Sequence, residues 1–386
     1  MNKIATHLSE LEQKLIDMNQ YIYENPELGN CEVKAYDYIT TLLKDNDFQL
    51  EEKFLGIDTA FRGTIKSNKP GPTIVFMAEY DALPEIGHGC GHNMIATTSV
   101  GSGIVLSKMI QDIGGTVIVL GTPAEEIDGA KVDMVEEGVF DDVDAAFIAH
   151  PANQTVVGIE CLAMDAIEFE FIGKAAHAAA SPEKGINALD GVIGMFNSVN
   201  ALREHLIAST RIHGVITEGG IAANIVPERA VAQFYVRATT KTYLKEVVEK
   251  VNNCAKGAAL ATGTTVNIRN YEKSYDNMVR NNKLIDLVDK HFKASGIGNI
   301  DDGRASLGSA DAGNVSHVCP TLHPMFEIVE PSVAGHTKAF ADATQTSFAI
   351  EQMMKVITSF VSASIELIES PEVLKEIKED FENSVK

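Results

Sequence analysis

Residues 73–93 read TIVFMAEYDALPEIGHGCGHN, an apolar run that passes directly into acidic, glycine, cysteine and histidine residues. The run from Thr73 to Ala78 is nearly continuous in apolar side chains rather than alternating. Such runs are typical of strands that are buried on both faces of a sheet. The sequence therefore predicts a buried strand whose carboxyl end carries chemically active side chains.

Two further apolar runs have the same character, Thr116 to Gly121 and Ala145 to Ala149. Helical periodicity precedes the first strand and separates the three runs. The segments with this periodicity are 8–22, 32–43, 94–111 and 130–137. Because strands and helices alternate, we expect an α/β fold with a mixed, mostly parallel sheet flanked by helices.

The middle of the chain has a different pattern. Strand-like segments at 166–171, 231–238 and 265–269 are interleaved with helical segments at 186–206 and 244–260. This pattern marks three of the four strands of a β-α-β-β-α-β order and predicts an inserted α+β, ferredoxin-like domain with an antiparallel sheet. The α/β pattern then resumes with a helix at 282–293, a strand at 322–328 and a long helix at about 338–366. We therefore expect a main domain over 1–163 and 273–386, interrupted by a second domain over 164–272.

The composition excludes some classes of partner. With 54 acidic and 32 basic residues the net charge is −22, so we expect no nucleic-acid partner and no membrane partner, since both need basic patches. The chain shows neither a secretory signal nor an apolar run of membrane-spanning length. Five scattered cysteines favour a reducing cytoplasm over a disulfide framework. These are Cys31, Cys90, Cys161, Cys254 and Cys319.

Side chains that bind metals follow each of the three early strands. Cys90 and His92 come after the first strand, Glu125 and Glu126 after the second, and His150 after the third. In an open α/β sheet the carboxyl ends of the strands line one crevice, so these groups are expected to meet there. Thiolate, imidazole and carboxylate are the usual ligands of zinc and similar cations. One of the paired glutamates can ligate while its neighbour takes a proton from water.

The sequence resembles a metallopeptidase family that includes aminoacylases, carboxypeptidase G and bacterial amidohydrolases. Within it, the resemblance is greater to the branch of indoleacetyl-amino-acid hydrolases, p-aminobenzoyl-glutamate hydrolase subunits and aminoacylase-1-like dipeptidases. It runs from the first helix to Ala341. The motifs that carry it are Asp81-Ala82-Leu83-Pro84, His88-Gly89-Cys90-Gly91-His92, Pro123-Ala124-Glu125-Glu126, Gly173-Lys174-Ala175-Ala176-His177-Ala178 and Gly335-His336-Thr337.

The resemblance implies a metal-dependent hydrolase that cuts the amide bond of small N-acyl amino acids or dipeptides, with two divalent ions. Zinc is the first expectation, with manganese or cobalt as alternatives. Cys90 would lie between the ions, and the remaining ligands would be His92, Glu126, His150 and His336. Glu125 would be the general base and Asp81 would orient the ligands.

The resemblance also assigns residues of the smaller, lid-like domain. His177 would stabilise the oxyanion, in this family often across a dimer, so we expect a homodimer or larger homo-oligomer through this domain. Asn224 and Arg237 match positions that contact substrate. Asn93 departs from the family pattern, in which many members have aspartate after the Cys-Gly-His triplet.

Two other functions remain open from the residues alone. The first is a metal-independent thiol hydrolase with Cys90 as nucleophile and a histidine as base. The second is a metal-binding subunit without turnover, although the presence of Glu125 speaks against it. The sequence leaves open whether the small-molecule substrate is an acyl amino acid, a dipeptide or an aminobenzoyl-glutamate-type compound.

Overall fold

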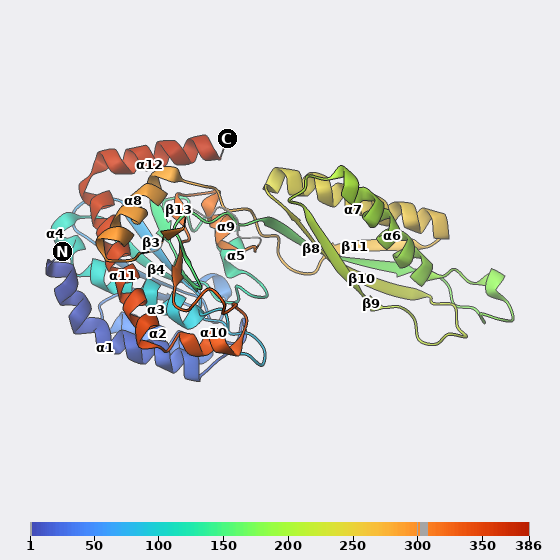
Figure 1. The fold of residues 1–386 in the computed structure, drawn as a ribbon, viewed down its shortest axis with the longest axis horizontal. Coiled ribbons are helices and arrows are strands. Elements are labelled where there is room, and N and C mark those ends of the chain that lie inside the picture. The colour runs from blue at the N-terminus through green and yellow to red at the C-terminus, as the bar shows by residue number, and fades with distance from the viewer. Residues whose placement is uncertain (1, 299, 302–307, 386) are drawn as a thin grey trace. The chain divides into compact units, whose positions relative to one another are not determined.

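The apolar runs of the first part of the chain form a six-stranded sheet in the structure, a computed structural model that describes residues 2–298, 300–301 and 308–385. The strand order is β1-β2-β4-β3-β5-β13. Figure 1 labels β3, β4 and β13 of this sheet. The parallel strands are β3 (Thr73–Ala78), β4 (Thr116–Gly121), β5 (Ala145–Phe147) and β13 (Thr321–Leu322). At the other edge β2 (Phe61–Lys66) and β1 (Gln49–Glu52) are antiparallel. The predicted mixed, mostly parallel sheet is confirmed.

Helix α3 (His92–Ser107) directly follows the cysteine- and histidine-rich loop and is buried along its whole length. It packs along β3 and β4 and contacts α1 (Asn2–Glu24) and α11 (Ser347–Glu369). A Cβ at Gly101 would lie 2.8 Å from Ile357 of α11 and 2.9 Å from Leu15 of α1, so the three helices approach closely at this glycine. The other helices of this unit are α2 (Val33–Lys44), η1 (Phe54–Gly56), α4 (Ile110–Ile113), α5 (Ala130–Glu136), α8 (Asn282–Ala294), α9 (Ala312–Ser316), α10 (Lys338–Ala343) and α12 (Pro371–Ser384).

Two elements near the C-terminus differ from the prediction. The expected helix 338–366 is broken into α10 and α11, because Thr346 accepts a hydrogen bond from the Ala349 N–H and caps a new helix. The expected strand 322–328 is divided at His323 and Pro324 into β13 and β14 (Met325–Glu327), which belong to different sheets. Proline lacks the N–H that a continuous ladder needs.

Strand β14 belongs to a small mixed sheet of order β12-β7-β14-β6. Its other strands are β12 (Ile300–Asp301), β7 (Thr155–Val156) and β6 (His150–Ala152). Strand β6 pairs parallel with β14, so that His150 stands opposite Met325. This pairing fixes the backbone of the segment that carries the predicted ligand His150.

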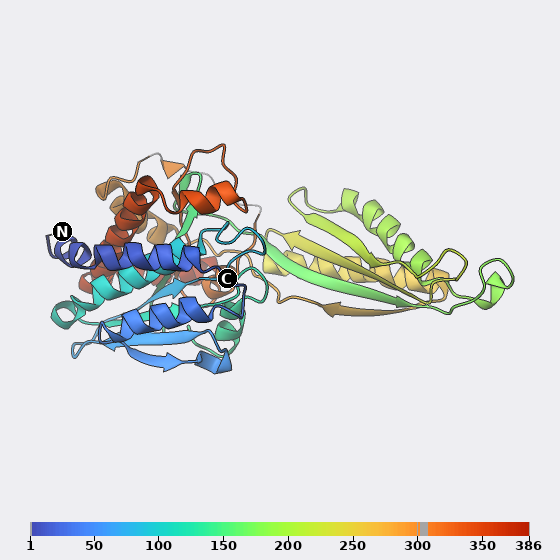
Figure 2. The same cartoon turned by 90° about the horizontal axis from the view of Figure 1, so that it is seen from below.

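The middle of the chain forms a four-stranded antiparallel sheet of order β11-β8-β10-β9. The strands are β8 (Ala163–Ile172), β9 (Arg211–Glu218), β10 (Arg229–Ala238) and β11 (Thr265–Asn270). Helices α6 (Ala188–Leu202) and α7 (Lys241–Thr262) pack on this sheet and on each other (Figure 2), with the short η2 (Pro182–Lys184) and η3 (Arg203–His205) nearby in sequence. Strand β9 has little apolar signal because it is an edge strand in which only Ile212 is buried.

Contacts divide the chain into two units. The first comprises Met1–Glu160, Met278–Ser306 and Ala310–Lys386, and the second comprises Cys161–Asn277 and Leu307–Ser309. The domain limits expected from the sequence, 1–163, 164–272 and 273–386, stay a prediction. Within the described part of the chain, no helix combines the length and apolarity needed to cross a membrane.

Candidate metal centre

Loops and strand ends at one edge of the main sheet carry the predicted ligand residues. Cys90 lies in the loop that joins β3 to α3, and His92 is the first residue of α3. Glu125 and Glu126 lie in the loop after β4, and His150 begins β6. Because the carboxyl ends of parallel strands meet at one edge of a sheet, these segments converge although they are far apart in sequence.

His336 completes the cluster from the loop before α10. Its N–H donates to the Gly89 carbonyl at 2.9 Å, which ties this loop to the one that carries Cys90. The ligand atoms form three overlapping groups in which all atoms lie within 4.8 Å of one another. The groups are Cys90–His92–His150, Cys90–Glu126–His336 and His92–Glu125–Glu126. The structure therefore brings the predicted ligands and the predicted base together.

The spacing within the cluster is that of ligands around cations. Cys90 Sγ lies 3.3 Å from His150 Nε2 and 3.5 Å from His336 Nε2. Glu126 Oε1 lies 3.7 Å from His336 Nε2 and 3.9 Å from His92 Nε2. Ligand atoms on one tetrahedral zinc ion are roughly 3.3–3.8 Å apart.

Two buried polar atoms of the cluster make no hydrogen bond. Among the described residues, neither His92 Nε2 nor Glu126 Oε1 has a hydrogen-bond partner. Such atoms cost about 1–3 kcal/mol each when they are left unsatisfied, whereas a cation would satisfy both. Nitrogen, sulfur and oxygen donors suit zinc and similar divalent ions. The residues present therefore fit a divalent cation.

Gly91 allows the Cys90 loop to lie against the segment that carries His150. Its φ is +82°, and a Cβ there would lie 2.4 Å from Pro151 Cγ. His150 Nδ1 hydrogen-bonds the Pro151 carbonyl oxygen at 2.6 Å, which directs Nε2 towards Cys90. Any larger residue at 91 would push the two ligands apart.

Asp81 fixes the orientation of two predicted ligand residues. Its Oδ1 accepts a hydrogen bond from His92 Nδ1 at 2.8 Å, and its Oδ2 accepts one from the Glu126 N–H at 3.0 Å. Burial disfavours both charges, but their mutual attraction prevails: it raises the pKa of His92 well above its usual value and lowers that of Asp81. With Nδ1 engaged, Nε2 is the nitrogen that faces the cluster.

Glu125 has the environment of a general base. Burial raises the pKa of its carboxyl well above the usual value, and the nearby Glu79 and Asp311 carboxylates raise it further. A raised pKa makes a carboxylate a stronger base towards water.

Comparison with known proteins identifies the family to which this chain belongs. The sequence model of peptidase family M20/M25/M40 matches residues 75–363. The chain belongs to this family. The Xaa-Arg dipeptidase of Mus musculus is 32% identical over 395 residues, which cover 98% of this chain and 91% of the mouse protein. One p-aminobenzoyl-glutamate hydrolase subunit from Escherichia coli (strain K12) is 35% identical over 293 residues, or 70% of this chain and 60% of that protein.

A solved structure of the family has the same fold. It is the YxeP protein of Bacillus subtilis, described as a dinuclear metal-binding peptidase of family M20, with a TM-score of 0.68 and 20% identity. The match covers 92% of this chain and 99% of that one. The predicted family and the predicted class of enzyme, a peptidase or amidohydrolase, are confirmed. Family membership and the donor set together support binding of divalent metal.

The thiol-hydrolase alternative does not suit the environment of Cys90. Burial raises the pKa of its thiol, and although the neighbouring His92 opposes this rise, Glu126 and Glu125 add to it. A nucleophilic cysteine needs the opposite, a lowered pKa. A cation bound at Cys90 would favour the thiolate form in this M20 peptidase.

A buried ionic triad beside the centre escaped the sequence analysis. Lys131 Nζ lies 2.6 Å from Glu79 Oε1 and 2.7 Å from Asp311 Oδ1, and all three side chains are fully buried. The other oxygen of Glu79 lies 3.7 Å from His92 Nε2. Burial opposes the charge on Lys131, but Asp311 and Glu79 outweigh it and raise its pKa. The sequence offers two signals, Glu79 at a strand end and Asp311 in a glycine-rich turn that resembles a serine-acid turn of the family. Lys131 looks like any polar helix residue.

Asn93 does not belong to the ligand groups. Its Nδ2 donates to Asn19 Oδ1 at 2.8 Å and to Thr344 Oγ1 at 3.0 Å, both outside the cluster. Asn93, which replaces the aspartate of many family members, therefore connects α3 to α1 and to the turn between α10 and α11.

The second unit carries the remaining predicted residues at two separate places. His177 and Asn224 are neighbours, since the Ala178 N–H donates to the Asn224 carbonyl and His177 bridges to Ile225. Arg237 lies in β10, where it donates to Ser309 Oγ at 2.9 Å.

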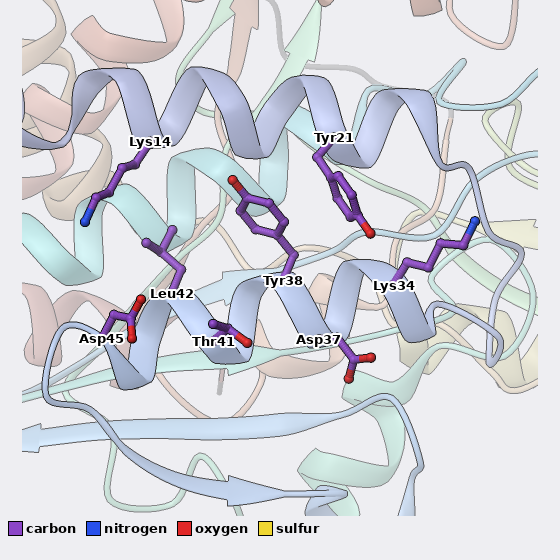
Figure 3. Close-up of a pocket in the computed structure, with 8 residues that line it drawn as sticks. All are labelled: Lys14, Tyr21, Lys34, Asp37, Tyr38, Thr41, Leu42 and Asp45. Atoms are coloured by element: carbon purple, nitrogen blue, oxygen red, sulfur yellow. The ribbon is translucent and has the colours of Figure 1, made fainter.

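A surface groove of about 520 Å³ lies between α1 and α2, apart from the metal centre (Figure 3). Its lining residues are Lys14, Tyr21, Lys34, Asp37, Tyr38, Thr41, Leu42 and Asp45. The Tyr21 and Tyr38 ring centroids are 4.8 Å apart. Both signs of charge line the groove, and no ligand of the metal centre contributes to it.

Proposed function

We propose that this chain is a two-metal amidohydrolase that cuts the amide bond of dipeptides or small N-acyl amino acids, with Glu125 as general base. The single observation that supports this most is the convergence of thiol, imidazole and carboxylate atoms within 4.8 Å beside Glu125. The proposed ligands are Cys90, His92, Glu126, His150 and His336.

The donor set favours two cations rather than one. Five ligand residues exceed the four that a closed tetrahedral zinc site takes, and Cys90 belongs to two of the three groups. Zinc is the proposed metal, because sulfur and imidazole donors suit it, with manganese or cobalt as alternatives. When bound, such cations lower the pKa of a water molecule and polarise a carbonyl group.

The chain's own residues then move the proton and hold the geometry. Glu125 takes a proton from the attacking water and returns it to the leaving amine. Asp81 keeps His92 in one orientation throughout. The protonated Glu125 that results from the first step then serves as the acid of the second step.

His177 is the proposed donor to the oxyanion. Its Nδ1 accepts the N–H groups of Ala179 and Ala180 at 3.3 and 3.2 Å. A neutral imidazole that accepts at Nδ1 carries its proton on Nε2, which suits a hydrogen-bond donor. Asn224 beside it is a proposed substrate contact, and Arg237, whose pKa burial lowers, is a proposed partner for a substrate carboxylate.

The length of the second sheet supports a homodimer. Arg229 pairs with Ile172 at the His177 end, whereas Arg237 pairs with Met164 at the other end. At about 3.3 Å per residue the eight-residue offset is roughly 26 Å, too far for one small substrate to touch both ends. Two copies that contact each other through 164–272, the proposed lid and dimerisation domain, would supply His177 and Arg237 to one site.

The mouse relative is named for dipeptides that end in arginine, so dipeptides are the first substrates to test. Aminobenzoyl-glutamate-type compounds are the second class to test, because the Escherichia coli relative is named for such a substrate. A cytoplasmic location is proposed from the scattered cysteines, and the net charge of −22 supports the absence of a nucleic-acid partner.

The decisive experiment compares metal-loaded wild type with Glu125→Gln on a panel of dipeptides and N-acyl amino acids. We expect Glu125→Gln to stay folded, to keep its metal and to lose about 10²–10⁴-fold in kcat. The exposed Glu137→Gln is the matched control and should keep wild-type rates. Activity that survives removal of metal with EDTA would indicate a thiol hydrolase. A metal-loaded wild type that turns over nothing would indicate a metal-binding subunit without catalysis.

A further inference from the structure

The carboxylate of Glu32 is fully buried and reaches the turn that carries the proposed base. Glu32 is the N-cap residue of α2, but its side chain makes no capping hydrogen bond. Its Oε1 instead accepts the Ala124 N–H at 2.8 Å, and its Oε2 accepts the Thr59 hydroxyl at 2.9 Å. Ala124 immediately precedes Glu125, so one peptide bond separates this contact from the base.

Ala124 has a backbone conformation that needs support. Its φ is +62°, in the left-handed region that a residue with a Cβ rarely adopts. Such a conformation costs on the order of 1 kcal/mol or more and persists only where its surroundings impose it. The Ala124 carbonyl accepts N–H groups from Ile127, Asp128 and Gly129 at 3.3, 2.9 and 2.7 Å. Hydrogen bonds within the turn therefore engage the Ala124 carbonyl group, whereas the Glu32 carboxylate engages the Ala124 N–H group.

The segment before Glu32 contacts the same turn. A Cβ at Gly29 would lie 2.7 Å from Ile127 Cγ1 and 2.9 Å from Ala124 Cβ, so the segment lies directly against the turn. Asn30 Nδ2 donates to Asp128 Oδ2 at 3.2 Å. The chain thus contacts the turn at several points between residues 29 and 32.

A purely structural role explains Glu32 poorly. No lysine, arginine or histidine pairs with its carboxylate among the described residues, and a buried carboxylate without a cation is unfavourable. A well-packed apolar residue would stabilise the fold as well or better. What an apolar residue cannot do is accept the Ala124 N–H.

We propose that Glu32 is a positioning residue that holds Ala124 in its left-handed conformation and thereby sets the direction of Glu125 and Glu126. This inference rests on the proposed function, since it assigns a task within the same site. Glu32 contacts no reacting group and acts through the turn. Its removal should therefore affect turnover and cation binding more than the fold.

The test compares Glu32→Leu with Glu32→Gln, which keeps an oxygen that can accept the Ala124 N–H. Three quantities are measured: kcat and KM on a dipeptide, the zinc Kd by competition with a chelating dye, and the thermal midpoint. We expect Glu32→Leu to lose about 10–100-fold in kcat at little change in KM, the loss typical of a misplaced catalytic group. Its zinc Kd should weaken by about tenfold or more. Glu32→Gln should restore most of both.

The matched control is Thr59→Val, which removes the other hydrogen bond of Glu32 and leaves the one to Ala124. It should lower the thermal midpoint but keep kcat and zinc Kd close to wild type. If Glu32→Leu changes the thermal midpoint but neither kcat nor zinc Kd, the proposal is overturned. If Glu32→Leu does not fold, Gly29→Ala decides, because a Cβ at residue 29 presses on Ala124 and Ile127 of the same turn and should lower kcat. An unchanged kcat would overturn the proposal.

The two hypotheses fail differently. If zinc-loaded wild type hydrolyses nothing, the proposed function is wrong, but the zinc Kd values of Glu32→Leu and Glu32→Gln still decide the role of Glu32. If wild type is active and Glu32→Leu matches it in kcat and zinc Kd, only the role of Glu32 is wrong.

Discussion

At the scale of single residues, the buried carboxyl groups of this peptidase differ according to their partners. Asp81 pairs with an imidazole and has a lowered pKa although burial opposes its charge. Glu32 has only neutral hydrogen-bond donors, and burial raises its pKa to about 7. Asp311, which shares Lys131 with Glu79, has its pKa raised to about 6, again by burial. Similar side chains therefore serve different tasks through different surroundings.

The raised pKa of Glu32 predicts a pH-dependent cost to stability. A carboxyl with a higher pKa in the folded chain contributes stability that is complete below its unfolded pKa of about 4.5 and is lost as the pH rises through about 7. Glu32→Gln does not titrate. Its free energy of unfolding relative to wild type should therefore rise between pH 5 and pH 8, by at most about 3 kcal/mol.

Urea unfolding of both metal-free proteins at the two pH values measures this difference. Removing the metal excludes the pH dependence of cation binding. If the difference in free energy of unfolding between wild type and Glu32→Gln stays constant from pH 5 to pH 8, Glu32 has an ordinary pKa.

At the scale of elements, the periodicity of apolar residues in the sequence predicts individual helices and strands. The continuous apolar runs of β3 and β4 identified buried parallel strands, and the residues after them identified the cluster around Cys90. The break between α10 and α11 and the division at Pro324 were missed because helical and apolar periodicity continue across them. The Lys131–Glu79–Asp311 triad was missed because its members are joined only in three dimensions. Long-range polar contacts of this kind leave no periodic trace in a sequence.

The triad connects three elements of the main domain, and its charges depend on one another. Lys131 belongs to α5, Glu79 follows β3 and Asp311 precedes α9. Lys131→Met would leave two carboxylates buried without their cation. We expect a loss of about 3–5 kcal/mol in the free energy of unfolding, measured by urea denaturation.

The control for this prediction is Lys283→Met, which breaks the exposed pair with Glu376 and should cost less than about 1 kcal/mol. Replacing the whole triad with neutral residues, Glu79→Gln, Lys131→Met and Asp311→Asn together, should recover much of the loss. Equal stabilities of Lys131→Met and Lys283→Met would show that the buried pair is no stronger than a surface one.

At the scale of the whole molecule, the division of labour between the two units implies a test of the homodimer. The proposed metal ligands and Glu125 belong to the first unit, while His177 and Arg237 lie at opposite ends of the sheet in the second. If His177 acts in the site of a partner copy, each site needs Glu125 from one chain and His177 from the other.

Two inactive variants should therefore complement each other. In a mixed dimer of Glu125→Gln and His177→Ala, one site carries both defects and the other carries neither. Random pairing of co-expressed, differently tagged chains should restore roughly a quarter of wild-type kcat, because half of the dimers are mixed and each has one intact site. Purified mixed dimers should reach about half. If each chain used its own His177, every site in the mixture would lack one residue, and the mixture would stay as inactive as its parents.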